Sequence, residues 1–393
     1  MSLEVYPGRP TSDEIRLDLN GVIRGAVRVA LELVLEEEIR EIVGAGRYAR
    51  ALGRKDTRNG SYLRTLVTAF GPVDLTVPRS RENGSAGAVL GRYGRRSEEI
   101  DDAITSAYVH GVSTRNMEKV TQALMGESVS RSTVSRITKA LDERVEALRK
   151  APIEAPIVYL YLDATFLDAR WARTVENVSA LVAYGVGEDG KRCLLGITIG
   201  PQESEESWAD LLQQLVDRGL HGVRLVISDA HAGLARAVRR FLPEARHQRC
   251  VVHLERNVLA KVPHRLSGRV GRELSRIFDA ESPKIAKQRL DHFVAGLGRQ
   301  VPEAVEVLVN GFIAATQFFL FPKAHWRRIR SSNGLERLHG EIKRRIRSVG
   351  AFPDRASALR LITAVAIEVT SVWAARQYLD MSEEVKAELA KVA

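Results

Sequence analysis

Cysteine is scarce in this chain of 393 residues, which contains only two, Cys193 and Cys250. Two cysteines cannot form the disulfide framework of a small secreted protein, so we expect a reducing compartment. The first residues, 1–14, lack the apolar core of a signal peptide. The most apolar stretch that we identify, 361–375, contains polar residues and is shorter than the ~18 residues that a membrane span needs. These absences predict a soluble, intracellular protein with no membrane contact.

Positive charge, by contrast, is in excess. The chain has 59 Lys and Arg against 49 Asp and Glu, a formal net charge of +10 and a pI of about 9.7. A basic balance favours a polyanionic partner, because Lys and Arg that neutralise phosphates release counterions. Charge alone leaves the nature of that partner open. At roughly 100–200 residues per domain, the length allows two to four domains.

Residues 1–96 combine an apolar helix with a small β-hairpin, and we assign this region to DNA binding or dimerisation. Two short runs alternate in polarity around a Gly-Pro turn, which is typical of paired strands. The expected elements, in order, are an extended polar segment 1–20, a helix 21–44, a basic loop 47–59 and two strands within 61–81.

Residues 97–150 have the pattern of two short helices joined by a tight turn. Gly126 is placed to end the first helix and Ser130 to cap the second. This arrangement is typical of a helix-turn-helix, whose second helix enters the major groove of DNA, although any small helical bundle shows the same pattern. The apolar positions at helical spacing are Met117, Val120 and Leu124, then Val134, Ile137 and Leu141. The expected DNA contacts are Arg115, Arg131, Ser132 and Arg136.

Strands and helices alternate from residue 151 to 262, which predicts an α/β domain with a mixed sheet. An antiparallel hairpin should come first and the parallel part second. The expected strands are 158–163, 178–187, 191–199, 223–229 and 245–251, and the expected helices are 203–220, 232–242 and 253–262. An all-helical region, 263–325, follows without a strand. The remainder, 326–393, completes the core with a basic stretch and a long buried helix from 354 to about 379.

Two carboxylates stand at the ends of apolar strands, Asp163 after VYLYL and Asp229 after VRLVIS. Sites in open α/β sheets form outside the carboxyl ends of the strands, so these two acids are expected to converge. A buried carboxylate needs a partner, and oxygen ligands alone favour Mg²⁺ or Mn²⁺ over zinc. The alternative is that these residues are turn residues or helix caps, Asp229 for the helix 232–242.

A third acid, Glu336, lies in the basic stretch SSNGLERLHGEIKRR, where Asn333 can begin a helix. Cations that follow on the same helix would attract phosphates, although a solvated helix with internal ion pairs has the same composition. Three carboxylates can hold two Mg²⁺ ions about 3.5–4 Å apart, the arrangement that serves in-line phosphoryl transfer. The candidate DNA contacts here are Arg337, Lys343, Arg344 and Arg347.

At these residues the sequence resembles bacterial insertion-sequence transposases of the Mutator type, which are DDE transposases with a ribonuclease-H-like (RNase H-like) core. The resemblance covers roughly residues 55–380, and its segments together are highly specific. In the catalytic part they are YLYLDATFLDAR, VISDAHAGL, HQRCVVHLERNVL and SSNGLERLHGEIKRRIRSVGAFP. In the N-terminal part they are GVSTRNMEKV and SVSRSTVSRIT, which look like the family's DNA-binding region.

The resemblance places the three catalytic, metal-binding acids on Asp163, Asp229 and Glu336, and the family's basic residue on Lys343. Asp229 follows Asp163 by 66 residues and Glu336 follows Asp229 by 107, and the family accounts for the longer interval by an all-helical insertion. We prefer Asp163 to its neighbour Asp168 because Asp163 closes the predicted strand.

Further expectations concern activity and partners. The resemblance implies binding to terminal inverted repeats, then Mg²⁺-dependent cleavage and strand transfer into target DNA, through a circular intermediate. Because transposon ends come in pairs, a homodimer is expected. The expected location is the bacterial cytoplasm, in association with the nucleoid. Two other classes stay open: a DNA-binding regulator without catalysis, and a structure-specific nuclease that cuts without joining.

The Cys-x-x-His signature of the family falls on Cys250 and His253. A structural zinc needs four ligands, and the only other sulfur in the sequence is the distant Cys193. His231 and His247 lie nearby in sequence, but we do not expect zinc. We expect Cys250 and His253, together with Asn333, to support the active site by packing and hydrogen bonding.

Overall fold

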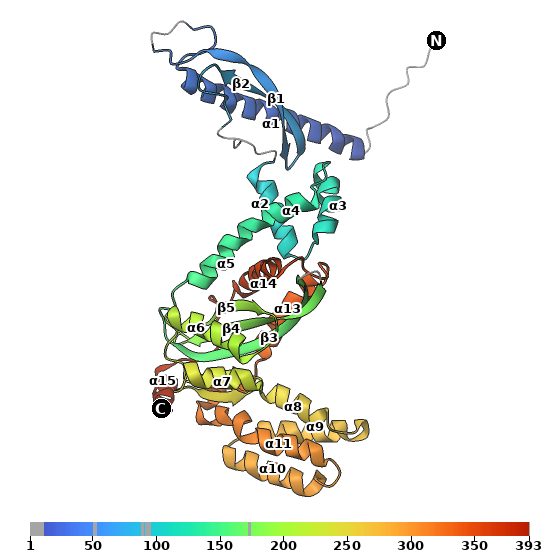
Figure 1. Ribbon diagram of the computed structural model, residues 1–393, viewed down its shortest axis with the longest axis vertical. Coiled ribbons are helices and arrows are strands. Elements are labelled where there is room, and N and C mark those ends of the chain that lie inside the picture. Colours follow the sequence, from blue (N-terminus) through green and yellow to red (C-terminus); the bar gives the residue numbers. More distant parts are fainter. Residues whose placement is uncertain (1–11, 50–52, 88–89, 91–95, 172–173, 393) are drawn as a thin grey trace, which may run out of the picture. The chain divides into compact units, whose positions relative to one another are not determined.

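The computed structural model describes residues 12–49, 53–87, 90, 96–171 and 174–392. Two compact units make up the chain, Met1–Lys139 and Ala140–Ala393 (Figure 1). The boundary falls inside the predicted region 97–150, so that the helix-turn-helix candidate is in the first unit and the last helix of that region is in the second.

The first unit begins with a long helix, α1 (Ser12–Val43), which packs on a hairpin of β1 (Arg58–Thr68) and β2 (Gly71–Ser80). The expectation of extended backbone before residue 21 was wrong, because α1 begins at Ser12. The stretch 12–20 is polar, yet Leu, Glu and Arg in it are good helix formers. The buried core of this subregion is formed by Leu35, Ile39, Val43, Leu66, Val73, Leu75 and Val77.

Three short helices complete the first unit: α2 (Glu98–Val109), α3 (Thr114–Met125) and α4 (Arg131–Ile137). The predicted turn between α3 and α4 is confirmed. Gly126 ends α3 in the left-handed conformation at φ 69°, and the Ser130 side chain accepts a hydrogen bond from the Thr133 backbone N–H. One predicted core position was wrong, since Leu124 is 76% exposed.

A 3₁₀ turn, Thr138–Ala140, follows α4, and α5 (Leu141–Lys150) belongs to the second unit. There it contacts α14 (Arg355–Thr370), and Arg360 binds Asp142 at 2.6 Å. The apolar series predicted for one helix from Val134 to Leu141 is therefore divided between two helices.

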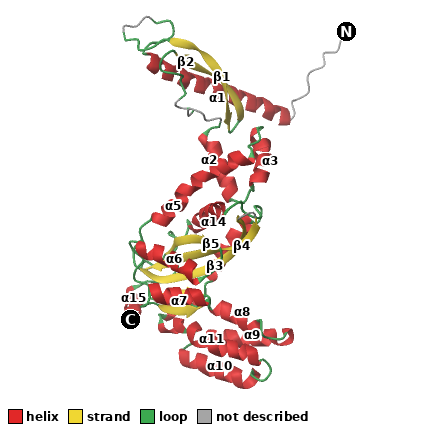
Figure 2. Cartoon of the chain, in the orientation of Figure 1, coloured by secondary structure: helices red, strands yellow, loops and turns green. Residues whose placement is uncertain are grey.

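The second unit is built on a mixed sheet with the strand order β5-β4-β3-β6-β7 (Figure 2). The antiparallel pairs β3–β4 and β4–β5 precede the parallel pairs β3–β6 and β6–β7, as predicted. The strands are β3 (Ile157–Trp171), β4 (Thr174–Gly187), β5 (Arg192–Gly200), β6 (Leu225–Ser228) and β7 (Arg246–Arg249).

The first strand continues well past Asp163, which corrects the expectation that this residue closes it. Asp163 lies opposite Val182 in the middle of the strand, and pairing extends to Trp171 opposite Thr174. The reason is that β4 is as long as β3 and supplies hydrogen-bond partners over the whole hairpin, which a local apolar run does not reveal.

Helices cover both faces of this sheet (Figure 1). On one face, α6 (Glu205–Asp217) and α7 (Ala232–Phe241) enclose a core with β3, β4 and β6. On the other face lie α13 (Asn333–Ile346) and α14. Members of the first core include Leu160, Leu162, Val226, Trp208, Leu212 and Leu234. The opposite face carries a stack of Tyr161 on Tyr184 at 4.4 Å, with Trp373 edge-on to Tyr184.

Helix α14 ends at Thr370, earlier than the predicted limit near residue 379. The apolar residues beyond it form hydrogen-bonded turns, in which Trp373 N–H donates to the Thr370 carbonyl. Gln377 then reaches the carbonyl of Asp189 in the β4–β5 turn. Of these apolar residues only Trp373 and Leu379 are buried, whereas Val372, Ala374 and Ala375 are exposed. The last helix is α15 (Glu383–Ala390).

The segment 263–325 is all helical, as predicted. It contains α9 (His264–Phe278), α10 (Pro283–Leu297), α11 (Pro302–Ala315) and two 3₁₀ turns, Gln317–Leu320 and Lys323–His325. It follows α8 (Val251–Leu259) and leads through α12 (Trp326–Ile329) to α13.

One apolar segment here was overlooked in the sequence. Among the described residues, Pro302–Leu320 is the single helical stretch long and apolar enough to cross a membrane by length and composition. Within the unit, α11 packs against α8 and β7. Gly311 allows this close approach, since a Cβ there would lie 2.6 Å from the Arg249 guanidinium. One such helix is weak support for a membrane span, because a core helix passes the same test.

Candidate active site

Asp163 and Asp229 come together at neighbouring parallel strands. The last residue pair between β3 and β6 is Tyr161 opposite Ile227. Asp163 comes two positions after Tyr161, and Asp229 comes two positions after Ile227. Because side chains alternate along a strand, both aspartates extend the face that carries Tyr161. The Asp229 side chain accepts a hydrogen bond from the His231 backbone N–H at 3.0 Å, while His231 itself caps α7.

Asp163 is the more buried of the two, with 8% of its surface exposed. Burial raises the pKa of Asp163 to about 7; His253 opposes this effect, and the carboxylates of Asp229 and Glu336 add to it. Burial is the largest contribution, and the smaller repulsion from the two carboxylates reflects their proximity to Asp163. His339 is the neutral neighbour of Asp163, with Nδ1 3.5 Å from Oδ2. Its burial lowers its pKa to about 4, so it is uncharged at neutral pH.

Glu336 occupies the first turn of α13, and two residues of α8 hold its carboxylate. Arg256 donates to both oxygens, at 2.7 and 3.1 Å, in a bidentate ion pair. His253 Nε2 lies 3.6 Å from the same carboxylate. Two side chains of α8 thus hold the carboxylate of Glu336, which itself belongs to α13.

Cys250 and His253 tie α8 to the start of α13. The Cys250 sulfur is fully buried and accepts from the Ser332 backbone N–H at 3.3 Å and from its hydroxyl at 3.4 Å. The interaction with Cys250 raises the pKa of His253 to about 9 despite its burial, so His253 is cationic beside Glu336. Asn333 is exposed at the first position of α13. The next position, Gly334, has no room for a larger residue, because a Cβ there would lie 2.5 Å from the Tyr184 hydroxyl.

The two cysteines lie at opposite edges of the sheet. Cys193 is on β5, whereas Cys250 follows β7 at the other edge. His247 donates to or accepts from the Ser228 hydroxyl at 2.7 Å. Across the described ranges, no group of three or more His, Cys, Asp or Glu side chains forms a metal site as it stands. Of the three predicted acids, Glu336 is held in the ion pair with Arg256.

The predicted DNA-contact residues lie on exposed surfaces of both units. Arg344 is partly engaged, because its guanidinium binds Glu341 at 2.8 Å. In the second unit the exposed members are Arg337, Lys343, Arg344 and Arg347 on and just after α13. In the first unit they are Arg115, Arg131, Ser132 and Arg136 on α3 and α4. The alternative acid Asp168 is exposed on β3 and accepts from the Asn177 side chain, outside this cluster.

Three residues of the cluster were missed from the sequence: His339, Arg256 and Glu203. The first two had a usable signal, since His339 is three positions after Glu336 and Arg256 three after His253, a spacing that shares one helix face. Glu203 had none, because it precedes α6. Its carboxylate accepts from the Trp208 indole N–H at 3.0 Å and lies 3.7 Å from His231 Nδ1. Burial raises its pKa, and Asp229 adds to this.

This fold and site define an α/β protein whose sheet gathers acidic side chains beside a basic helix. Sequence comparison gives the family. The family model described as "Transposase, Mutator family" matches residues 9–376, and the chain belongs to that family. The transposase for insertion sequence element ISRM5 of Rhizobium meliloti is 36% identical over 92% of this chain and 91% of its own length.

Two further relatives support the same assignment. The transposase for IS1081 of Mycobacterium tuberculosis is 35% identical over 96% of this chain and 92% of its own length. The transposase for IS256 in transposon Tn4001 of Staphylococcus aureus is 33% identical over 92% of this chain and 94% of its own. Among solved structures, a simian T-cell lymphotropic virus intasome in complex with a PP2A regulatory subunit matches at 10% identity and a TM-score of 0.18, which carries no argument.

Proposed function

We propose that this protein is a DDE-type transposase that binds the terminal inverted repeats of an insertion sequence and catalyses Mg²⁺-dependent DNA cleavage and strand transfer. The observation that carries the proposal is geometric: Asp163 and Asp229 each lie two positions beyond the last residue pair of two adjacent parallel strands, and the helix of Glu336 reaches Asp163 through His339 at 3.5 Å. Membership of the transposase family makes DNA the substrate to test first.

The proposed core is RNase H-like. Its support is a central strand, β3, flanked by an antiparallel hairpin partner on one side and by parallel β6 on the other. On this view the first acid lies within the central strand, the second follows its parallel neighbour, and the helices of 263–325 are an insertion before the third acid.

The donor set fits a hard divalent cation, with two Mg²⁺ or Mn²⁺ ions expected. All three candidate ligands are carboxylates, and a bound cation would offset the burial of Asp163 and the repulsion from its neighbours, which together raise its pKa. When bound, the metal pair would activate a water or DNA 3′-hydroxyl and stabilise the departing 3′-oxygen. Glu336 would join the aspartates only on leaving Arg256, so its ion pair is a competing state.

The remaining residues of the site position and attract the DNA. Neutral His339 neighbours Asp163 without adding charge, and Lys343, Arg337 and Arg347 supply an exposed cationic surface on the helix of Glu336. In the first unit, the α3–α4 pair is the proposed reader of the terminal repeat. Two ends must be brought together, so we propose a homodimer acting in the bacterial cytoplasm on nucleoid DNA.

A strand-transfer assay tests this function. Purified protein is mixed with a labelled DNA end of its element and a plasmid target, with Mg²⁺ or with EDTA. Joined products should form only with metal, and should vanish in Asp163→Asn, Asp229→Asn and Glu336→Gln while binding to the end persists. Asp168→Asn is the matched control, because it removes an exposed carboxylate from the same strand and should join normally.

The other two classes predict different results in the same assay. Binding without cutting or joining, even with Mn²⁺, would identify a DNA-binding regulator. Cutting without joining would identify a nuclease. Loss of joining in Asp168→Asn to the same extent as in Asp163→Asn would mean that the wrong acid has been assigned.

A further inference from the structure

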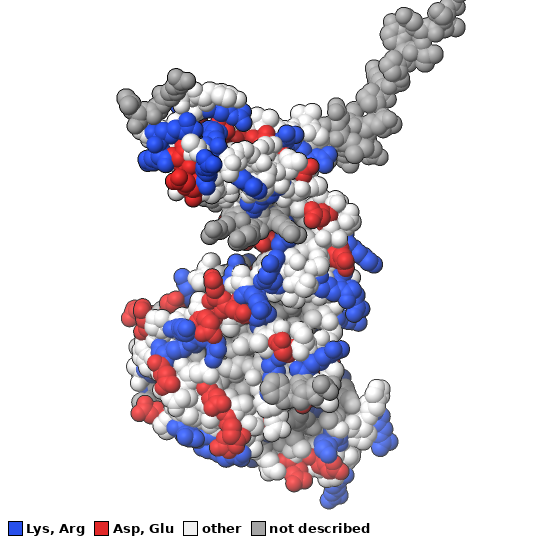
Figure 3. Space-filling model, turned by 45° about the horizontal axis from the view of Figure 1, so that its top comes forward, with Lys and Arg blue, Asp and Glu red and all other residues white. Residues whose placement is uncertain are grey.

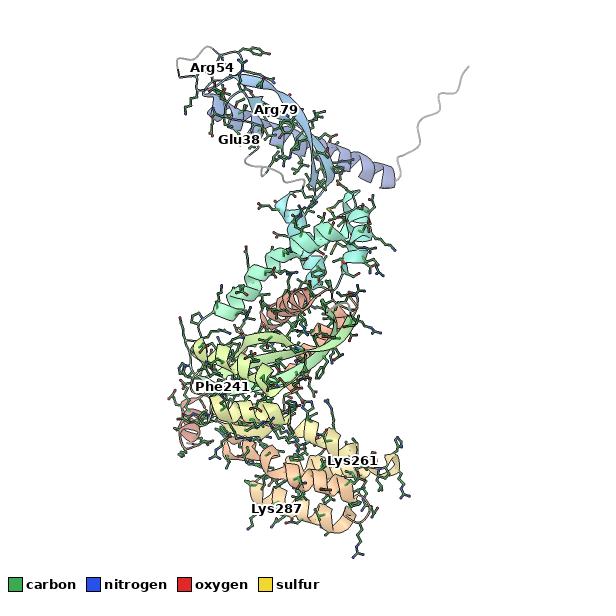
Figure 4. All side chains as sticks on the ribbon, viewed as in Figure 1. Glu38, Arg54, Arg79, Phe241, Lys261 and Lys287 are labelled. Carbon is green, nitrogen blue, oxygen red and sulfur yellow. The ribbon has the colours of Figure 1, made fainter. Side chains whose placement is uncertain are left out.

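A groove of about 780 Å³ lies in the first unit, away from the α3–α4 pair. The second half of α1, the loop that follows it and the hairpin form its walls. Its lining carries both charges: three arginines, Arg47, Arg54 and Arg58, stand with the two acids Glu32 and Glu36 and with Tyr48, Ser61 and Thr76. Lys and Arg side chains gather over this end of the unit in Figure 3, and Arg54 is labelled there in Figure 4.

Tyr48 at the rim of the groove has an unusual backbone conformation. Its φ of 61° makes it the single non-glycine residue with a positive φ among the described residues. A left-handed conformation costs a side-chain-bearing residue about 1–2 kcal/mol. The side chain gains nothing within the unit in return, since Tyr48 is 99% exposed. A strained residue that presents a bare aromatic ring beside arginines is typical of a binding surface.

Hydrogen bonds tie Asp56, two residues after Arg54, to the hairpin. Asp56 is buried, and its carboxylate accepts from the backbone N–H groups of Thr57, Glu82 and Asn83 and from the Asn83 side chain. These donors keep the pKa of Asp56 well below its usual range even though burial opposes them. Gly44 adds a close contact, because a Cβ there would lie 2.8 Å from the Gly53 carbonyl. These contacts fix the chain on both sides of the groove, at Gly44 and at Asp56.

The acids of α1 nearest the hairpin are used inside the unit. Glu32 accepts from the Thr76 backbone N–H at 2.9 Å, Glu36 binds Arg58 at 2.6 Å, and Glu38 accepts from the Gly87 backbone N–H at 2.9 Å. Arg47 and Arg54 are exposed, and neither has a carboxylate partner within the described part of the chain. The groove thus keeps two uncompensated guanidinium groups.

We propose that this groove binds the sugar–phosphate backbone of duplex DNA, as a second DNA surface of the first unit. Arg47 and Arg54 supply the phosphate contacts, and the Tyr48 ring packs on a sugar or an exposed base. Membership of the transposase family makes duplex DNA, rather than an acidic peptide, the polyanion to test first. The inference rests on the proposed function for the identity of the polyanion, but the groove itself is independent of the catalytic acids.

The test is equilibrium binding of the full chain to a fluorescent duplex, followed by anisotropy in EDTA over a series of salt concentrations. Arg47→Gln/Arg54→Gln should weaken binding to duplexes of any sequence by a similar factor, roughly tenfold at low salt, and reduce the salt slope by about two. Tyr48→Ala should weaken binding without changing the slope. Lys284→Gln/Lys287→Gln removes two exposed charges from α10 and serves as the matched control.

Arg47→Lys/Arg54→Lys guards against a misfolded variant, because it keeps both charges and should restore the salt slope. Unchanged affinity and slope in Arg47→Gln/Arg54→Gln, with the thermal melt of wild type, would overturn the proposal. So would an equal loss in the α10 control. Binding in EDTA needs no chemistry, so these results are separate from strand transfer: if wild type never joins DNA yet binds it through the groove, only the proposed catalytic function fails.

Discussion

At the scale of single residues, Asp163 is a carboxylate in an environment that disfavours its charged form. It is buried in the middle of a strand with a neutral histidine beside it and two other carboxylates near enough to raise its pKa. Such an arrangement lowers the stability of the folded chain and is characteristic of sites that serve a ligand. The destabilisation caused by the charged Asp163 carboxylate should therefore be measurable as a change in Tm.

We expect Asp163→Asn to raise the Tm of the metal-free protein at pH 8. The folded pKa of Asp163, about 7, is above its ordinary value of 3.8, so its favourable contribution is complete below pH ~4 and is lost as pH rises through 7. The gain of the variant should accordingly grow from pH 4 to pH 8. Each 1 kcal/mol would shift the Tm by roughly 2–4 °C. Thermal melts in EDTA across this pH range measure it.

Adding Mg²⁺ completes the same experiment. Millimolar Mg²⁺ should raise the Tm of wild type, because a ligand that binds only the folded state stabilises it, and should leave Asp163→Asn nearly unchanged. Asp168→Asn should follow wild type in both conditions. A Tm for Asp163→Asn at or below that of wild type in EDTA at pH 8 would contradict the electrostatic account of the site.

Residue-scale reasoning from sequence identified Asp163 and Asp229, which follow the last residue pair of two adjacent parallel strands, but Asp163 lies within its strand and does not end it. It could not find Glu203, whose importance depends on the packing of α6 against the sheet. Nor could it show that Glu336 is shared with Arg256, because α8 and α13 approach each other only through tertiary structure. The roles assigned to the three acids stay predictions.

At the scale of elements, the junction between α8 and α13 is the contact that orients Glu336. The buried Cys250 sulfur receives both polar hydrogens of Ser332, and the Val251 backbone N–H donates to the Arg330 carbonyl at 2.9 Å. Because His253 is on the same helix as Cys250, any loosening of this junction changes the cation beside Glu336.

Cys250→Ala should therefore destabilise the protein by about 1–3 kcal/mol, since it leaves two buried donors of Ser332 without an acceptor. It should also lower the pKa of His253 from about 9 towards 6.5, because the thiol is the largest cause of the rise. Histidine NMR titration and denaturant unfolding measure the two effects. Cys250→Ser keeps an acceptor and should recover part of both. A His253 pKa unchanged in Cys250→Ala would mean that the carboxylates, not the thiol, set it.

The limits of elements were predicted well where the chain itself marks them, and less well elsewhere. Gly126 and Ser130 bound their helices as expected, because a left-handed residue and a hydroxyl cap act locally. The length of β3 depends on its partner β4, and the end of α14 depends on Trp373 packing against Tyr184. Neither partner is near in sequence, so the hydrophobic pattern alone predicted β3 too short and α14 too long.

At the scale of the whole molecule, the proposed functions separate between the two units. The candidate catalytic acids, α8 and α13 all belong to Ala140–Ala393, whereas the α3–α4 pair and the arginine-lined groove belong to Met1–Lys139. Each unit has hydrophobic core of its own, one beneath the hairpin and one beneath the mixed sheet. Recognition of DNA and chemistry on DNA should then be separable in solution.

We expect a fragment of residues 1–139 to bind duplex DNA without requiring Mg²⁺, because it contains none of the three acids. A fragment of residues 140–393 should keep the Mg²⁺-dependent rise in Tm but join a DNA end far less efficiently than the full chain, because end binding is lost. Circular dichroism confirms that each fragment is folded before anisotropy and strand transfer are measured. Full joining activity in 140–393 alone would place end recognition in the second unit, on the cations of α13, and would leave the first unit a different task.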